Sequence, residues 1–360
     1  MMEDLNSILK EAVERGASDI MLVAGLPAAM KINGVIEREG RERLMPEDTE
    51  RLVKEIYHVS KDRDINTLLK NGDDDFSFSL PGLSRFRVNV LKQRDSLAAV
   101  IRVVSFDLPN RIDKGIPDNV MEFAKLRKGL VLVTGPAGSG KSTTLACMID
   151  AINNSRSDHI VTIEDPIEFL HRHNLSVVTQ REIATDTESY ETALRAVLRQ
   201  APDVILLGEM RDYETIKVAI TAAETGHLVI STLHTVGAVN TIDRIIDIFP
   251  PEQQQQIRMQ LAMVLQGVVS QQLITTVDGK VKPAFEVMVV NTAIRNMIRE
   301  AKAHQMENVI LSSAAEGMIT MDSSLLQLVK SGAVSAMEAL DHSSNPEQLQ
   351  KRLKAEGLIK

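Results

Sequence analysis

Hydrophobic and polar positions follow one pattern in the first part of this chain and another in the rest. Up to about residue 105, short stretches alternate apolar and polar residues, which is typical of strands with one buried face. The clearest stretches are DFSFSL (75–80) and RFRVNVL (85–91). They place six apolar side chains on one face: Phe76, Phe78, Leu80, Phe86, Val88 and Val90. The turn PGLS (81–84) predicts that the two strands form a hairpin.

After residue 117 the pattern changes to short aliphatic runs separated by helical segments. The runs cover 130–135, 159–165, 203–209 and 227–234. Each run ends near glycine, an acid or histidine, as buried parallel strands do when functional groups follow their carboxyl ends. From about residue 252 the pattern is mostly helical, with one break at 275–290 (TTVDGKVKPAFEVMVV) that predicts a hairpin.

The stretch 106–117 (FDLPNRIDKGIP) separates these two patterns. It holds two prolines and one glycine and has little periodicity, which is typical of a linker. We therefore expect an N-terminal domain over residues 1–105, a linker over 106–117 and a second domain over 118–360.

Composition limits the possible partners and compartments. A net charge of -8, with 3% aromatic residues and no Trp, disfavours binding to nucleic acid phosphates and bases. The single cysteine, Cys147, excludes an intrachain disulfide and fits a reducing, cytoplasmic location. No run approaches the ~18 apolar residues of a membrane helix, so we expect membrane contact only through a partner protein.

A phosphate-binding motif stands directly after the first aliphatic run. GPAGSGKST (135–143) matches G-x-x-x-x-G-K-[ST], between a strand and a helical stretch. This arrangement directs backbone amides and a helix N-terminus toward phosphate groups. The expected ATP-binding residues are Gly135, Pro136, Ala137, Gly138, Ser139, Gly140, Lys141, Ser142 and Thr143. Lys141 would contact the β and γ phosphates, and the Ser142 hydroxyl would bind Mg²⁺.

Carboxylates follow the next two aliphatic runs. Glu164, Asp165 and Glu168 come after one strand, and one of them could activate the water that attacks the γ phosphate. Without the phosphate loop, a solvated acidic loop would be the simpler interpretation. Glu209 ends the following run, where this class of enzyme places its Mg²⁺-side carboxylate.

Histidines bracket the fourth run, and arginines interrupt the N-terminal strands. His227 and His234 lie seven residues apart, so they fit the two ends of one strand better than a metal-binding pair. Arg87 lies on the face opposite the phenylalanines, and Arg102 interrupts the run AAVIRVV. Two interpretations remain open: arginines on the solvent-exposed face of a half-exposed sheet, or arginines whose negative partner is a nucleotide phosphate on another subunit, as arginine fingers in trans.

Taken together, these motifs resemble the secretion ATPase superfamily of type II and type IV systems, and most closely its type IV pilus retraction ATPases. The resemblance extends through 16–36, 243–262 and 293–300 (AIRNMIRE). IEDPIEF stands where that family has its Asp box, GEMRD where it has its Walker B motif, and TGHLVISTLHT where it has its His box. Ala137 and Ala201 depart from the family pattern, which more often has threonine and aspartate there.

The resemblance implies a PAS-like N-terminal α+β domain followed by a RecA-like P-loop ATPase domain with a helical C-terminal part. It implies a homo-hexamer at the cytoplasmic face of the inner membrane that acts on a pilus platform protein and powers pilus retraction and twitching motility. In this family pattern Ser142 and Glu209 serve Mg²⁺, and Glu164 or Glu168 activates water. His227 and His234 become γ-phosphate sensors, and Arg87 and Arg102 become trans arginines.

Three other functions compete with this interpretation. Pilus extension and type II secretion ATPases share the core, but many carry a four-cysteine zinc site that one cysteine cannot form. A RecA-like nucleic acid translocase should have a basic channel, which the net acidic charge disfavours. A non-enzymatic scaffold would lose the acids at the strand ends, which this chain keeps.

The segment 291–300 (NTAIRNMIRE) predicts a short amphipathic helix. Ile294, Met297 and Ile298 have the spacing of an apolar helix face that docks on the second domain. Arg295 and Arg299 lie four residues apart, a repulsive spacing within one helix. We therefore expect both arginines to face outward toward carboxylates of another element or partner.

Overall fold

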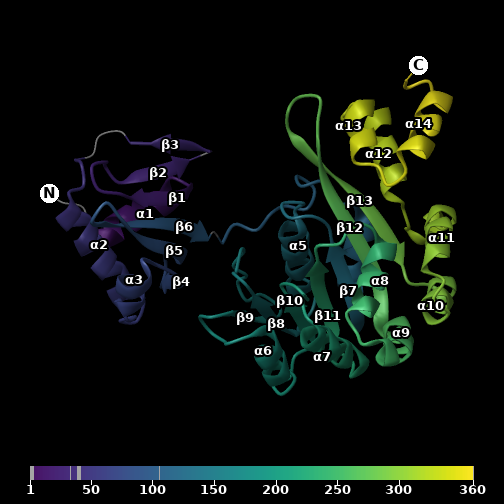
Figure 1. The fold of residues 1–360 in the computed structure, drawn as a ribbon, viewed down its shortest axis with the longest axis horizontal. Coiled ribbons are helices and arrows are strands. Elements are labelled where there is room, and N and C mark those ends of the chain that lie inside the picture. Colours follow the sequence, from purple (N-terminus) through teal and green to yellow (C-terminus); the bar gives the residue numbers. More distant parts are fainter. Residues whose placement is uncertain (1–3, 33, 39–41, 105, 360) are drawn as a thin grey trace. The chain divides into compact units, whose positions relative to one another are not determined.

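The computed structural model describes residues 4–32, 34–38, 42–104 and 106–359, which form two compact units (Figure 1). The first unit comprises Met1–Asp107 and Glu168–Leu170, and the second comprises Leu108–Ile167 and His171–Lys360. Ser105, where we place the end of the first domain, lies outside the described residues.

The first unit is a six-stranded antiparallel sheet with helices packed against it. Its strands are β1 (Ala17–Leu22), β2 (Ala29–Ile32), β3 (Val35–Glu37), β4 (Asp73–Leu80), β5 (Ser84–Gln93) and β6 (Ser96–Val104), in the order β3-β2-β1-β6-β5-β4. Its helices are α1 (Leu5–Glu14), α2 (Pro46–Val59) and α3 (Asn66–Asn71). The predicted hairpin is confirmed: Phe78 lies opposite Phe86, and both are buried in the core of this unit.

The second unit is built on a seven-stranded sheet in the order β13-β12-β7-β11-β10-β8-β9. Its strands are β7 (Gly129–Thr134), β8 (His159–Glu164), β9 (Val177–Glu182), β10 (Val204–Leu207), β11 (Leu228–Leu233), β12 (Leu265–Thr275) and β13 (Val281–Val289). All pairings are parallel except that of β12 with β13. The four aliphatic runs are therefore confirmed as neighbouring parallel strands, β7, β8, β10 and β11.

Helices cover both faces of this sheet and continue to the C-terminus (Figure 1). They are α4 (Asp118–Met121), α5 (Lys141–Asn153), α6 (Tyr190–Val197), α7 (Tyr213–Glu224), α8 (Ala238–Asp247), α9 (Pro251–Val264), α10 (Thr292–Arg299), α11 (Met306–Ser312), α12 (Met321–Lys330), α13 (Ala336–Asp341) and α14 (Pro346–Ala355). Two apolar clusters enclose the strands, and helices α12 to α14 share a smaller core with β12 and β13. The expected α/β fold class, with an α+β unit before a P-loop-type unit with a helical C-terminal part, is confirmed.

Two strands of the second unit differ from the sequence prediction. The hairpin lies where expected, but its first strand, β12, begins at Leu265, inside a stretch predicted as helical. Pairing with β7 on one side and β13 on the other overrides the weak local preference of this segment. β9 has no aliphatic run because it is an edge strand with an exposed Val177.

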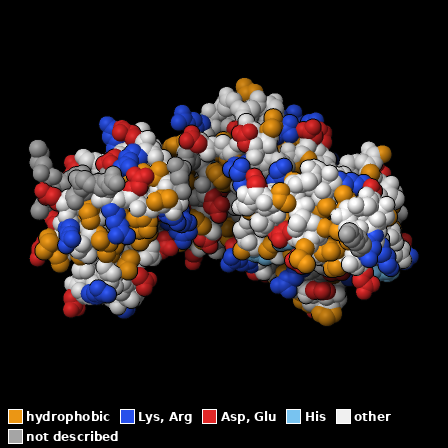
Figure 2. Space-filling view, turned by 90° about the horizontal axis from the view of Figure 1, so that it is seen from above, with side chains coloured by type: hydrophobic (Ala, Val, Ile, Leu, Met, Phe, Trp, Pro, Cys, Tyr) orange, Lys and Arg blue, Asp and Glu red, His pale blue; other side chains and the backbone are white. Residues whose placement is uncertain are grey.

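The surface and the helix lengths bear on the expected partners. On the face shown in Figure 2, Lys and Arg side chains are interspersed with Asp and Glu and form no continuous basic track. Among the residues that the structure describes, no helix is long and apolar enough to cross a membrane.

Candidate functional site

The phosphate-binding motif forms the loop between β7 and α5. Gly140 is the N-cap of α5, and its φ of 87° lies in the left-handed region that glycine adopts without strain. None of the described side chains caps this helix N-terminus, so its first amides remain for a ligand. The predicted loop therefore has the form that binds phosphate groups at a helix N-terminus.

Side chains of this loop are arranged around its backbone. The Lys141 ammonium donates to the carbonyl oxygens of Gly135 at 2.8 Å and Pro136 at 2.9 Å. Pro136 to Gly138 are exposed, whereas Ser139 is buried, and Ser142 and Thr143 lie half-buried in the first turn of α5. The hydroxyls of Thr134 and Ser139 are buried without a hydrogen-bond partner among the described residues. Such orphaned groups fit a loop that closes around a ligand's oxygens.

Glu209 lies at the same edge of the sheet, two strands from β7. It is 9% exposed and follows the end of β10. Its Oε2 pairs with Arg211 Nε at 2.6 Å and with His234 Nε2 at 3.2 Å. Both contacts use the same oxygen, so within the described part of the chain Oε1 remains for a further ligand. The structure thus brings two of the predicted site residues, Glu209 and His234, into direct contact.

Backbone contacts from both neighbouring strands fix the segment that carries Glu209. The Gly208 amide donates to Ile163 O of β8 at 2.8 Å, and Thr232 Oγ1 of β11 donates to Gly208 O at 2.6 Å. A Cβ on Gly208 would lie 2.8 Å from the Tyr190 hydroxyl, so any larger residue here would force this tyrosine to shift. Burial, with the nearby Glu209 charge, raises the pKa of Tyr190, which keeps this hydroxyl neutral.

The acidic residues after β8 lie in different environments. Glu164 ends the strand, where its Oε1 accepts from Thr162 Oγ1 at 2.5 Å and Gln180 Nε2 at 3.2 Å. Glu168 is exposed in the loop that follows. The strand end therefore orients Glu164 at the edge of the sheet that holds the phosphate loop. Glu168 belongs to the first unit, and its role stays a prediction.

His227 lies at the other end of β11 from His234. Its Nδ1 donates to the carbonyl of Ala222 at 2.9 Å, and its own carbonyl accepts from the Gly129 amide at the start of β7. Six strand residues span about 20 Å, so within one chain the two histidines cannot contact the same ligand. A γ-phosphate sensor role for His227 stays a prediction.

Arg87 and Arg102 belong to the antiparallel sheet of the first unit. They are opposite each other on β5 and β6. Arg87 makes a two-pronged ion pair with Asp75, at 3.1 and 2.8 Å, and Arg102 Nε donates to Asp19 at 3.0 Å. Each arginine therefore has a carboxylate partner in its own sheet, which the sequence analysis did not predict. Their role in trans stays a prediction.

The helix α10 docks as expected, but one of its arginines does not face outward. Ile294 and Ile298 are buried in the core of the second unit. Arg295 instead donates to the carbonyls of Ala262 at 2.5 Å and Met263 at 3.1 Å, which end helix α9. The expectation for Arg295 was wrong because a helix C-terminus, with its unpaired carbonyls, competes with carboxylates for a guanidinium.

Sequence reasoning missed several residues of this edge. Arg211, the partner of Glu209, carries no motif signal beyond its place in GEMRD. Gln180 lies on the unpredicted strand β9 and orients Glu164. The described residues contain no group of three His, Cys, Asp or Glu that could hold a metal ion alone. A Mg²⁺ ion at Ser142 and Glu209 would therefore need oxygens of a bound nucleotide, which is how this ion is usually held.

Comparisons with known proteins all match this chain to secretion-system proteins or pilus ATPases. The family model for type II/IV secretion system proteins matches residues 1–353. The type IV pilus retractation ATPase PilT of Pseudomonas aeruginosa is 43% identical over 344 residues, 96% of this chain and 99% of that protein. The type IV pilus ATPase PilU of the same organism is 37% identical over 352 residues, 98% of this chain and 91% of that protein. A crystal structure of the pilus retraction motor PilT with bound ADP matches with a TM-score of 0.87 at 47% identity, over 97% of this chain and 100% of that one.

Proposed function

Since this chain belongs to the family of type II/IV secretion system proteins, we propose that it is a Mg²⁺-dependent ATPase that powers retraction of a type IV pilus. The observation that supports this best is the phosphate loop at the edge of the sheet that also holds Glu209 and His234. The likeness to PilT, including its ADP-bound structure, extends over nearly the whole chain.

The residues of the loop divide the work of holding ATP. The amides of residues 138–143 and the N-terminus of α5 bind the phosphate groups. Lys141, whose ammonium lies on the loop carbonyls, turns from them to the β and γ phosphates. Ser142 and Glu209 hold Mg²⁺, which neutralises charge on the transferred phosphoryl group when it is bound.

Hydrolysis needs an oriented water and a sensor of the γ phosphate. Glu164 or Glu168 accepts a proton from that water, and the bonds of Glu164 to Thr162 and Gln180 support the first choice. His234, bound to Glu209, registers whether the γ phosphate is present. We propose that Arg87 and Arg102 leave their aspartate partners and act on the nucleotide of a neighbouring subunit in a homo-hexameric ring.

The output of this cycle is mechanical. ATP binding closes each subunit on its neighbour, and hydrolysis releases it, which moves a platform protein in the inner membrane so that pilin subunits leave the fibre base. The motor works at the cytoplasmic face of that membrane and contacts it only through this partner.

Deletion of the gene with complementation tests the direction of force. The deletion strain should carry excess surface pili and lose twitching motility, and wild-type protein should restore retraction. Lys141→Ala should fail to restore it. Lys128→Ala, which changes an exposed lysine just before β7, at the end of that strand away from the phosphate loop, should succeed. A deletion strain without surface pili would mean that the motor extends pili instead.

ATP hydrolysis with and without DNA separates this function from a nucleic acid translocase. We expect no stimulation by single- or double-stranded DNA at low salt, because acidic and basic side chains are interspersed on the surface in Figure 2. Strong stimulation that disappears as salt is raised would favour the translocase.

A further inference from the structure

A glutamine outside every recognised motif contacts the phosphate loop from the adjacent strand. Gln271 lies on β12 and is 3% exposed. β12 runs parallel to β7, with Ser270 opposite Thr134, so Gln271 is the first residue beyond the point where β7 ends. We propose that Gln271 is a positioning residue that holds the phosphate loop in its nucleotide-binding form. This inference rests on the proposed nucleotide-binding function.

The side chain of Gln271 bridges the loop and the helix that follows it. Its Nε2 donates to the Ser139 carbonyl at 2.6 Å, and its Oε1 accepts from the Thr144 hydroxyl at 2.7 Å. Thr144 is fully buried in the first turn of α5, so both bonds are shielded from water. A primary amide carries a donor and an acceptor at the same end of the side chain. A carboxylate could not donate to Ser139, and an apolar side chain would leave both groups unpaired.

The glycines of the loop are packed directly against this residue. A Cβ on Gly135 would lie 2.1 Å from the Gln271 carbonyl oxygen. A Cβ on Gly140 would lie 2.8 Å from Gln271 Nε2. Because Gly135 and Gly140 have no side chain, Gln271 can pack directly against the backbone of the loop. Both glycines also have the positive φ values that glycine adopts without strain.

The conformation of the phosphate loop is therefore held by a residue of the adjacent strand β12. The side chain of Gln271 bonds to Ser139 and Thr144, so it acts on the nucleotide through these two residues. With both bonds formed, the loop amides keep one arrangement before nucleotide binds, which lowers the entropy cost of binding. Gln271 should therefore affect nucleotide affinity more than the rate of hydrolysis at saturating ATP.

The adjacent residue supplies a matched control. Gln272 is also a buried glutamine of β12, 9% exposed, but successive strand residues point to opposite faces. Its amide bonds to His342 at the end of α13, with Oε1 accepting from Nδ1 at 3.0 Å and Nε2 donating to the carbonyl at 3.3 Å. Gln271→Met and Gln272→Met remove the same chemical group at neighbouring positions of one strand, with only the first near the loop.

Binding of a fluorescent ADP analogue and steady-state ATP hydrolysis, both well below the melting temperature, test the role. Gln271→Met should raise Kd and KM about tenfold, equivalent to about 1.4 kcal/mol, with kcat changed less than about threefold. Gln272→Met should leave Kd within about twofold of wild type. Thr144→Val should weaken binding about threefold, and Thr144→Ser should restore it. The double variant Gln271→Met, Thr144→Val should lose less affinity than the sum of the single losses.

The outcomes separate the inference from the proposed function. Wild-type protein that fails to bind the analogue overturns the nucleotide-binding function itself. If the wild type binds but Gln271→Met binds equally well, or if both Met variants weaken binding alike, Gln271 has no positioning role. If Gln271→Met does not fold, Thr144→Val decides: unchanged affinity for that variant overturns the inference.

Discussion

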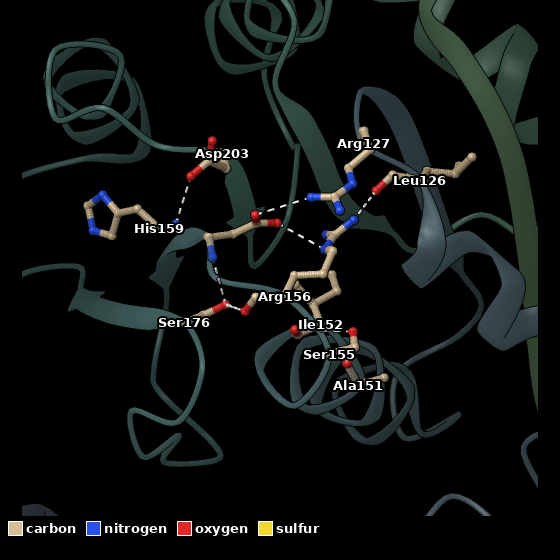
Figure 3. Close-up of polar contacts among 10 residues, drawn as sticks. Leu126, Arg127, Ala151, Ile152, Ser155, Arg156, His159, Ser176 and Asp203 are labelled. Atoms are coloured by element: carbon tan, nitrogen blue, oxygen red, sulfur yellow. Dashed lines mark hydrogen bonds and ion pairs between the residues drawn. The ribbon is translucent and has the colours of Figure 1, made fainter.

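Polar side chains line both ends of the parallel strands in the second unit. At one end they bond mainly to one another, and at the other end several remain available for a ligand. At the carboxyl end, where β7, β8, β10 and β11 finish, lie the phosphate loop, Glu164, Glu209 and His234. At the amino end, where the same strands begin, lies a cluster around Asp158 that includes Arg127, Arg156, His159 and Asp203; these four are labelled in Figure 3.

At the amino end most of the polar groups bond to one another, although Nη2 of Arg156 is buried without a hydrogen-bond partner among the described residues. Asp158 pairs with Arg156 Nε at 2.9 Å and with Arg127 at 3.3 Å, and Arg156 Nη1 donates to the Leu126 carbonyl at 2.5 Å (Figure 3). Burial lowers the pKa of Arg156, and Asp158 offsets part of this effect. The His159 amide donates to Asp203 at 2.8 Å. These bonds fix the starts of strands and the end of α5.

At the carboxyl end the polar groups converge but leave capacity for a ligand. The hydroxyls of Thr134 and Ser139 lack partners among the described residues, and both contacts of Glu209 fall on a single oxygen. The number of charged side chains therefore does not distinguish a binding site from a structural cluster. The distinction lies in where the remaining hydrogen-bonding capacity stands. At the carboxyl end it belongs to hydroxyls in and beside the phosphate loop, whereas at the amino end, within the described residues, it belongs to a guanidinium that is already paired with Asp158.

Two lysines, one just before β7 and one at the start of α5 after the phosphate loop, give the largest expected difference. Lys141→Ala should reduce kcat/KM for ATP hydrolysis by about 10²–10³, because it removes a preorganised positive charge from the transferred phosphoryl group. Lys128→Ala, at the exposed start of the strand, should leave kcat/KM within about twofold. If both variants retained wild-type activity in a steady-state assay, Lys141 would have no role in hydrolysis. The proposed difference between the two ends of the sheet would then be wrong.

Removal of a buried charge should expose the structural role of the amino end. Arg156→Met should destabilise the protein by about 3 kcal/mol, because it breaks the pair with Asp158 and leaves the Leu126 carbonyl without its donor. For a unit of this size that is roughly 6–10 °C in melting temperature. Arg127→Met should cost less than about 1 kcal/mol, since Arg127 is exposed.

Both variants should hydrolyse ATP at nearly the wild-type rate at low temperature. Calorimetry and a steady-state assay on the same preparations give the two quantities. A loss of activity in Arg156→Met without a loss of melting temperature would connect this cluster to catalysis and remove the distinction between the two ends.

Much of the carboxyl end could be predicted because its residues follow local patterns. An aliphatic run that ends at Glu209 or at the phosphate loop reports both the strand and the place of the side chain after it. The contacts of Gln271 could not be predicted, because they depend on β12 pairing with β7, far away in sequence, and β12 itself was expected to be helical. For Arg295 the residue type was informative but its partner, the end of α9, depended on tertiary packing.

The two histidines of β11 test the comparison within one strand. His234→Asn should lower kcat about tenfold, because Glu209 loses a partner beside the proposed γ-phosphate position. His227→Asn should leave the affinity of one subunit for ATP unchanged. The His227 ring bonds to the Ala222 carbonyl at the amino end of β11, away from the phosphate loop. A nucleotide-binding assay, followed by steady-state hydrolysis, distinguishes the cases. A fall in kcat for His227→Asn with unchanged binding would support a role across a subunit boundary.

The smallest expected effect concerns strain at the amino end. Ala201, in the loop before β10, has a φ of 50°, a left-handed conformation that costs an L-residue about 1–2 kcal/mol. The His159 ring holds this loop by donating from Nδ1 to the Gln200 carbonyl at 3.0 Å. Asparagine tolerates this conformation better than alanine, so Ala201→Asn should raise the melting temperature by about 1–2 °C.

The control for this change is Ala196, which lies within helix α6, where the backbone is right-handed. Ala196→Asn should lower the free energy of unfolding by about 0.5 kcal/mol, because asparagine has the lower helix propensity. Equal shifts of the two variants in the same direction would show that the backbone of Ala201 stores no relievable strain. Neither change should alter ATP hydrolysis, because a change in stability at the amino end of the sheet leaves the contacts of the phosphate loop at the carboxyl end unchanged.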